Sequence, residues 1–150
     1  MAAIGSKWVL IAQTRDGGFF DGLVAVRRKE IVKVAKSSSF EGRFAQTQPD
    51  WPPSAPAEID LDTTRGLIRD LSQISPLIGI EQERRFHTTM TWIGVVDKVG
   101  KGWLWLHETR PDASWHKRPL GYKLSRITKV AISDQYQTGL AAIAGTTPRP

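Results

Sequence analysis

The sequence contains no cysteine. Without thiols the chain cannot form a disulfide framework, use a cysteine nucleophile or bind a metal through thiolates. No apolar run approaches the ~20 residues of a membrane-spanning helix. Residues 1–5 lack the basic, apolar and cleavage-site succession of a secretory signal. These absences predict a cytoplasmic protein that does not contact a membrane.

The familiar catalytic signatures are also missing. The sequence has no Gly-x-Ser-x-Gly nucleophile turn, no phosphate-binding loop, no Gly-x-Gly-x-x-Gly and no His-Glu-x-x-His. We therefore expect a protein that is not an enzyme and that requires no cofactor.

The composition is that of a globular protein with an uneven charge. The chain has 150 residues, of which 40% are hydrophobic, and a net charge of +6. Residues 1–46 carry eight basic and four acidic side chains, residues 47–62 carry four acidic and no basic ones, and residues 101–150 have a net charge of +5. Basic ends favour a polyanionic partner, whereas the simpler interpretation is a solvated surface rich in Lys and Arg.

Two blocks of the sequence repeat at nearly constant offsets. Residues 31–45 align with residues 127–141 at an offset of 96, with six identities in fifteen positions. Residues 4–11 align with residues 99–106 at an offset of 95. Near-constant offsets in separate blocks predict an internal duplication.

The duplication predicts two related units, residues 1–46 and residues 62–150. Strands are expected at residues 8–14, 22–26 and 31–37 of the first unit, and at residues 77–80, 91–96, 103–108, 121–124 and 127–133 of the second. The first unit lacks an opening strand, which residues 77–80 can supply. The alignment also predicts four buried positions: Ile31, Val34, Ile127 and Val130.

Helices are expected after the last strand of each unit and before the second unit. Ser38 and Asp134 suit the N-caps of the two short helices, and Gly145 would end the second. A further helix is expected from Asp62 through Ser72. Its apolar face would be formed by Leu67, Ile68 and Leu71.

The segment between the units is predicted to be a linker. Residues 46–61 contain four of the nine prolines, which remove backbone donors and fix φ. We expect an extended, acidic linker over residues 47–61. Trp51 within it is expected to pack back onto a unit, with exposure to a partner as the alternative.

Several segments resemble an uncharacterised bacterial family of tandem Sm-like proteins. They are Trp92-Ile-Gly-Val-Val, Trp103-Leu-Trp-Leu-His-Glu, Tyr122-Lys-Leu-Ser-Arg-Ile-Thr-Lys-Val and, in the first unit, the run from Asp21 to Ile31. The resemblance covers most of residues 4–145 and rests on structural positions. It implies a mainly β fold of two Sm-like small barrels with short helices.

Basic side chains cluster before the Ile-x-Lys-Val sequence of both units. The candidates for contacts with nucleic acid are Arg27, Arg28, Lys29 and Lys33 in the first unit and Arg110, Trp115, Lys117, Arg118, Lys123 and Arg126 in the second. The cations would contact phosphates, and Trp115 would stack on a base. The alternative is two separate solvated patches, with Trp115 folded against its own hairpin.

The same hairpin contains four potential metal ligands, His107, Glu108, Asp112 and His116. Their spacing matches no established ligand pattern, and the neighbouring cations oppose metal binding. We expect no metal site.

Two tryptophans share one face of a predicted strand. Under the strand period of two, Trp103 and Trp105 lie opposite Leu104 and Leu106. One pair must be core, and the other must meet a helix, the other unit or a ligand. We expect both pairs to be packed in the core or between the units.

Together these features favour a non-enzymatic binding module. RNA or other nucleic acid is the expected ligand, through the basic loops. A protein-interaction or regulatory scaffold is the alternative, because function belongs to sites and not to folds. Self-association into a homo-oligomer is also compatible with the sequence.

Overall fold

The computed structural model describes residues 1–82 and 90–148. Its strands are β1 (Ala3–Ile4), β2 (Trp8–Thr14), β3 (Phe20–Arg27), β4 (Ile78–Glu81), β5 (Thr91–Val99), β6 (Trp103–Glu108), β7 (Leu120–Lys123) and β8 (Lys129–Ile132). The helices are α1 (Phe40–Ala45), α2 (Thr64–Ile74) and α3 (Gln135–Ala144), and three 3-10 turns are η1 (Asp16–Gly18), η2 (Arg28–Glu30) and η3 (Leu124–Arg126). The predicted mainly β fold with short helices is confirmed.

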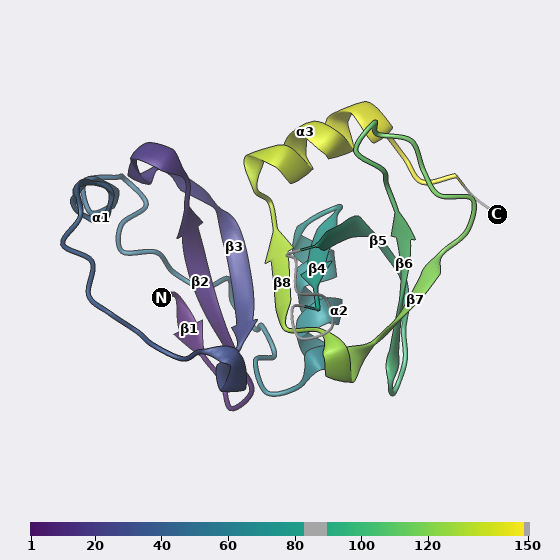
Figure 1. Cartoon of the computed structure of the whole chain (residues 1–150), viewed down its shortest axis with the longest axis horizontal. Helices are drawn as coiled ribbons and strands as arrows, with labels where there is room; N and C mark the ends of the chain where they lie inside the picture. Colours follow the sequence, from purple (N-terminus) through teal and green to yellow (C-terminus); the bar gives the residue numbers. More distant parts are fainter. Residues whose placement is uncertain (83–89, 149–150) are drawn as a thin grey trace.

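The strands form one antiparallel sheet in the order β1-β2-β3-β8-β4-β5-β6-β7. The first half of the chain, with β1 to β3 and α1, lies on one side of Figure 1, and β4 to β8 with α2 and α3 lie on the other. Strand β3 pairs with β8, from Leu23 opposite Ile132 to Val26 opposite Lys129. The two halves are therefore joined by strands that are far apart in the sequence.

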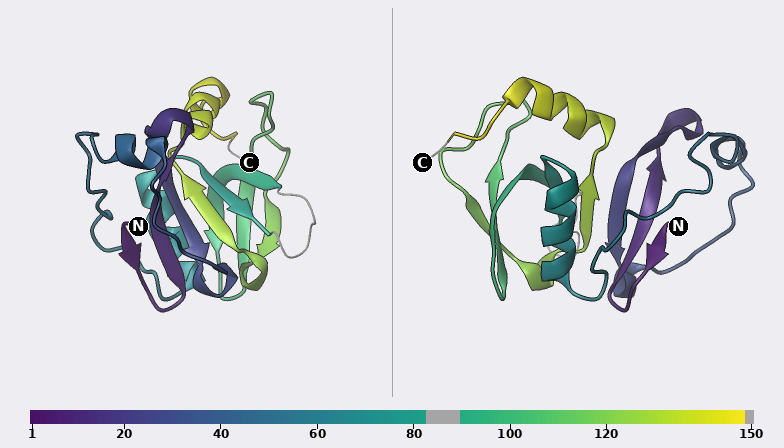
Figure 2. Two further views of the ribbon diagram at one scale, coloured as in Figure 1. Left: turned by 60° about the vertical axis from the view of Figure 1, so that its left-hand side comes forward. Right: turned by 180° about the vertical axis from the view of Figure 1, so that it is seen from behind.

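The second half curls back on itself. After α2, strands β4 to β7 follow one another, η3 turns the chain, and β8 returns to pair with β4, with Ile80 opposite Val130. The β5–β6 ladder has a register shift between Val96 and Lys98, and such a bulge increases the twist and bend of a strand. Figure 2 shows the resulting curved sheet, with α2 packed beside it.

The start of α2 differs from the prediction by one residue. Thr63, and not Asp62, is the N-cap, and its hydroxyl accepts a hydrogen bond from the backbone N–H of Gly66 (2.9 Å). Thr63 in turn donates to the Asp60 carboxylate (2.6 Å). Asp62 instead accepts from the backbone N–H of Ser6 (2.6 Å). The expected apolar face of the helix is confirmed, because Leu67, Ile68 and Leu71 are fully buried.

One apolar core spans both halves. It contains Trp8, Leu10 and Ala25 from the first half, the buried face of α2, and inward-facing side chains of β4, β6 and β8. The linker also enters this core at its end, since Leu61 is buried and its carbonyl accepts from the N–H groups of Lys7 and Trp8. No helix or strand lies between α1 and α2, as predicted.

Three backbone hydrogen bonds recur in the two halves at the offsets of the sequence alignment. The bond from Gly5 N–H to Trp8 O (2.9 Å) matches that from Gly100 N–H to Trp103 O (2.8 Å). The bond from Arg28 N–H to Lys7 O (2.9 Å) matches that from Leu124 N–H to Gly102 O (3.0 Å). The bond from Ile31 N–H to Arg28 O (3.1 Å) matches that from Ile127 N–H to Leu124 O (3.3 Å). The turns on either side of β2 and β3 thus have the same local geometry as the turns on either side of β6 and β7.

The last predicted strand of the first half is wrong. Residues 31–39 lie outside the sheet, and Val34 is 72% exposed. Ile31 is only partly buried, whereas Ile127 and Val130 are buried as predicted. The reason is the missing neighbour: β8 pairs with β4 as well as β3, and the first half has no counterpart of β4. Residues 77–80 do not fill this gap, because β4 pairs with β5 and β8.

The short helices follow the prediction more closely. Asp134 caps α3, and Gly145 ends it with a positive φ of 64°. Ser39, one residue after the predicted Ser38, caps α1 through a hydrogen bond from Gly42 N–H. Helix α2 extends to Ile74, two residues beyond the predicted end.

Replacing Gly66 with Ala should destabilise the protein although Ala is the better helix former. A Cβ at Gly66 would overlap the Asp60 carboxylate, which is fixed by its bonds to Thr63. We expect a loss of about 1–3 kcal/mol in the free energy of unfolding, as for other overpacked sites.

Gly139→Ala in α3 is the matched control, because a Cβ there meets no atom within 4 Å. It should stabilise the protein by about 0.5–1 kcal/mol. Urea denaturation of both variants measures the difference. Equal denaturation midpoints of the two variants would contradict the inference that the fixed Asp60 carboxylate leaves no room for a Cβ at position 66.

Val130 and Val34 occupy equivalent positions of the repeat but different environments. Val130→Ala removes buried methyl groups and should cost ~1–4 kcal/mol. Val34→Ala should stay within about 0.5 kcal/mol, as is usual for exposed positions. Thermal unfolding of dilute protein distinguishes the two, and a similar loss at both positions would place Val34 in a packed strand.

Candidate nucleic-acid interface

The turns that follow β3 and β7 lie at the same end of the sheet. Strand β3 ends at Arg27, whose backbone N–H donates to Thr128 O (3.0 Å) just before β8. The Arg27 guanidinium reaches Leu124 O in η3 (2.9 Å). The turn η2 that follows Arg27 is therefore close to η3, and both lie along the lower edge of Figure 1.

Each of these turns is bonded to a second turn from its own half. The Arg28 N–H bonds to Lys7 O, and the Leu124 N–H bonds to Gly102 O. Five exposed cations consequently share this end of the sheet, which we call the basic end: Lys7, Arg28, Lys29, Lys101 and Arg126. All five lie on turns that correspond between the halves by the repeat.

Two acidic residues belong to this end, Glu30 within η2 and Asp62 beside Ser6 and Lys7. Asp62 accepts the Ser6 backbone N–H, and this bond lowers the pKa of the Asp62 carboxyl below its ordinary value. Asp62 is therefore ionised at neutral pH and reduces the positive potential near Lys7. Arg28 is exposed and donates one bond to Gly5 O (3.1 Å).

Arg27 does not lie on the surface that the sequence suggested. Its side chain is buried, and Nε donates to Ile127 O (2.8 Å) while Nη2 donates to Leu124 O (2.9 Å). The guanidinium carbon also lies 4.9 Å from the centre of the Trp8 ring. Arg27 thus connects β3 to the turn before β8 and is not available to a phosphate.

Two more of the predicted cations flank the turns of the basic end. Lys33 is exposed on the segment that follows η2. Lys123 is exposed at the end of β7, where its Nζ lies 5.5 Å from the centre of the Trp103 ring. This contact corresponds to that of Arg27 with Trp8 in the first half.

The predicted hairpin residues lie at the opposite end of β6. Arg110 donates to Ser114 Oγ (3.2 Å) and Trp115 O (3.0 Å), which closes the hairpin. Trp115 is half-buried and donates its indole N–H to Ala144 O at the end of α3 (3.0 Å). Lys117 and Arg118 are exposed on the same hairpin. The hairpin side chains therefore lie apart from the basic end, and Trp115 packs against His107 of its own hairpin and against the end of α3.

The acidic and histidine side chains of this region connect β6 to the hairpin and to β7. His107 Nε2 lies 2.7 Å from His116 O, and the Tyr122 hydroxyl donates to the Glu108 carboxylate. Burial, reinforced by the Glu108 bond, raises the pKa of the Tyr122 hydroxyl far above its ordinary value. Among residues 1–82 and 90–148 no three His, Asp or Glu side chains form a group that could hold a metal ion.

We expected both the leucine pair and the tryptophan pair of β6 to be packed, and this is wrong for the tryptophans. Leu104 and Leu106 are fully buried, whereas Trp103 and Trp105 are 44% and 43% exposed. Their rings lie 6.5 Å apart and nearly parallel, at 26°. The period of two predicts that the two pairs lie on opposite faces, but only tertiary structure decides whether the second face is covered.

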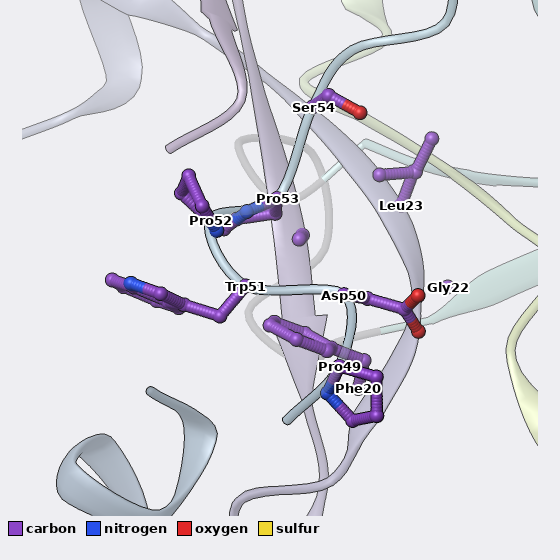
Figure 3. Close-up of a pocket in the computed structure, with 10 residues that line it drawn as sticks. Phe20, Gly22, Leu23, Pro49, Asp50, Trp51, Pro52, Pro53 and Ser54 are labelled. Atoms are coloured by element: carbon purple, nitrogen blue, oxygen red, sulfur yellow. The ribbon is translucent and has the colours of Figure 1, made fainter. Parts of the chain in front are cut away.

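A cavity of about 490 Å³ lies between the linker, the end of β2 and the start of β3. Figure 3 shows its wall of Phe20, Leu23 and the proline-rich turn around Trp51, with Asp50 as the charged group. Trp51 remains 45% exposed. Its polar side chains are the Asp50 carboxylate and the Ser54 hydroxyl, and the rest of the lining is apolar, proline or glycine.

No family model, curated protein or solved structure matches the chain. The assignment to a tandem Sm-like family stays a prediction. Within the described part of the chain, no helix has the length and apolar character needed to cross a bilayer.

Arg27→Ala should destabilise the protein, because it leaves two buried carbonyl oxygens without their charged donor. We expect a loss of about 1.5–3 kcal/mol for the hydrogen bonds to the guanidinium. Arg28→Ala, which removes a cation from the neighbouring exposed position, should cost about 0.5 kcal/mol or less. Chemical denaturation measures both, and an equal effect of the two variants would show that Arg27 is not a structural residue.

Proposed function

We propose that the protein is a non-enzymatic binding module built from two Sm-like small-barrel units that arose by duplication, and that it binds single-stranded RNA through the basic end. The observation that carries this proposal is the convergence of corresponding cationic turns from both halves at one end of a shared sheet. Acidic side chains also lie at this end, Asp62 beside Ser6 and Glu30 within η2.

Several structural correspondences support the duplication. The recurring hydrogen bonds of the turns have the offsets of the sequence repeat, and a cation lies over a tryptophan in each half: Arg27 over Trp8 and Lys123 over Trp103. The order of elements in the second half, a helix followed by four strands, a 3-10 turn and a last strand beside the first, is compatible with the small barrel that the resemblance implies.

The chemistry of the basic end suits a flexible phosphate backbone. Its cations are exposed and lie on turns, so that each can reach a different phosphate of one strand. Contacts of this kind give affinity without sequence preference, since base edges are not contacted. An RNA strand that crosses both η2 and η3 would contact the two halves of the protein at once.

A protein-interaction scaffold remains the second candidate. The observation that favours it is the exposure of apolar side chains, above all Trp103, Trp105 and Val34. Such contacts would depend weakly on salt, whereas neutralisation of phosphates gives a steep dependence.

Neutralising the basic end should weaken RNA binding and reduce its salt dependence. We expect wild-type protein to bind a labelled mixed-sequence RNA strand at ~50 mM salt, and the double variant Arg28→Ala/Lys29→Ala to bind more weakly with a log–log salt slope smaller by about 1.4, the value for two phosphate contacts on a single strand. Fluorescence anisotropy over a salt series measures both quantities.

Lys117→Ala/Arg118→Ala is the matched control, because it removes the same charge from the hairpin at the opposite end of β6. It should leave the slope unchanged. If wild type does not bind RNA, or if the control variant loses as much binding as the basic-end variant, the proposed interface is wrong.

A further inference from the structure

Strand β7 has one open edge. It is the last strand in the order of the sheet and pairs with β6, from Trp103 opposite Lys123 to Leu106 opposite Leu120. No other strand of the described residues covers its second edge. The N–H of Leu124 points toward the β6 side, where it bonds to Gly102 O. Because backbone groups alternate along a strand, the N–H of Lys123 points to the open side.

The corresponding edge in the first half is covered. By the offset of 96, β7 corresponds to residues 24–27 of β3. That edge of β3 is paired with β8, where Ala25 lies opposite Val130 and the Arg27 N–H donates to Thr128 O (3.0 Å). The edge of β3 at the corresponding positions thus accepts a strand within the molecule.

The chain also has an extended segment without a place in the sheet. Residues 33–36 correspond to β8 by the same offset, with Lys33, Val34 and Ala35 identical to their counterparts. The segment lies outside the sheet, with Val32 99% and Val34 72% exposed. The open edge of β7 corresponds to the paired edge of β3, and the segment of residues 33–36 corresponds to β8. One molecule therefore contains an unpaired equivalent of each partner in the β3–β8 pair.

We propose that residues 31–36 of one molecule pair antiparallel with β7 of a second copy of the chain. The register follows from β3 and β8: Val34 lies opposite Gly121, Lys33 lies opposite Tyr122, and the Lys123 N–H donates to Val32 O. Pro119, which has no N–H, ends the ladder beyond Leu120. Addition of a strand to an exposed edge is an established mode of association.

The side chains at this edge suit the incoming strand. In the first half Val130 is fully buried beside Ala25, next to Leu10. At the open edge the corresponding residues are Gly121 and Trp105, and the Trp105 ring lies across Gly121, since a Cβ there would approach the ring to 3.2 Å. Val34 of the second copy would pack against this ring. The association thereby buries the exposed face of Trp105 together with Val34.

The interface is head-to-tail, because the donor segment and the acceptor edge belong to opposite halves of the chain. Such contacts produce closed rings, of which a reciprocal two-fold dimer is the smallest, or open filaments. Self-association does not depend on RNA, and its test is therefore separate from that of the basic end.

Two variants disable the two sides of the contact. Val34→Pro removes the donor N–H of an exposed residue outside the sheet. Lys123→Pro removes the acceptor-edge N–H at a residue with φ of −68°, which proline adopts without strain. Lys123→Ala is the control that loses the charge and keeps the N–H, and Ser38→Pro is the control for proline in the same exposed segment.

Sedimentation velocity of wild type without RNA, up to about 100 μM, should show concentration-dependent assembly. Either proline variant should raise the dissociation constant at least about tenfold. Both controls should assemble like wild type, and circular dichroism confirms that each variant is folded. An equimolar mixture of Val34→Pro and Lys123→Pro should form a one-to-one dimer, because one intact contact remains between them.

Several results would overturn the proposal. Wild type that stays monomeric over this range excludes the contact, and so does a Val34→Pro variant that assembles like wild type. Loss of assembly in Lys123→Pro with full assembly in Val34→Pro would indicate that two β7 edges pair with each other instead. A mixture of the two folded variants that stays monomeric would exclude the head-to-tail arrangement.

Discussion

The pairing of β3 with β8 is the constraint on which the rest of the structure depends. It places the last strand of the second half against the first half and joins segments about a hundred residues apart in sequence. Arg27 fixes this seam, because its planar guanidinium donates at once to the carbonyls of Ile127 and Leu124. The turns of the basic end are neighbours because the seam positions the end of β3 beside the turn before β8.

Helix α2 depends on the same seam. Its first residue, Thr64, accepts the indole N–H of Trp8 (3.3 Å) and lies 3.5 Å from Nη2 of Arg27. The apolar face of the helix then packs into the core that both halves share. A helix that follows the linker in sequence thus covers the tryptophan of the first half, and the corresponding Trp103 has no such cover.

Local sequence predicted most of the strands, because β-branched and aromatic runs between glycine-containing turns have few alternatives. It failed where an identical sequence meets different neighbours. Residues 33–35 and 129–131 both read Lys-Val-Ala, yet one segment is a central strand and the other lies outside the sheet, since β4 exists in one half alone. Trp103 and Arg27 were misplaced for a related reason: periodicity assigns a residue to a face, while burial of that face depends on elements distant in sequence.

The difference between Arg27 and Lys123 follows from what each edge must do. At the permanent seam a guanidinium spans two carbonyls in a fixed geometry, which an ammonium on a flexible chain cannot reproduce. At the open edge of β7 a lysine keeps the charge over Trp103 in contact with water. Exposed edge strands commonly carry lysine, because its solvated charge discourages indiscriminate pairing. The edge of β3, where the halves meet, is thus permanently paired, whereas the open edge of β7 carries a solvated charge. This open edge accepts a partner only when apolar contacts compensate for the desolvation of that charge.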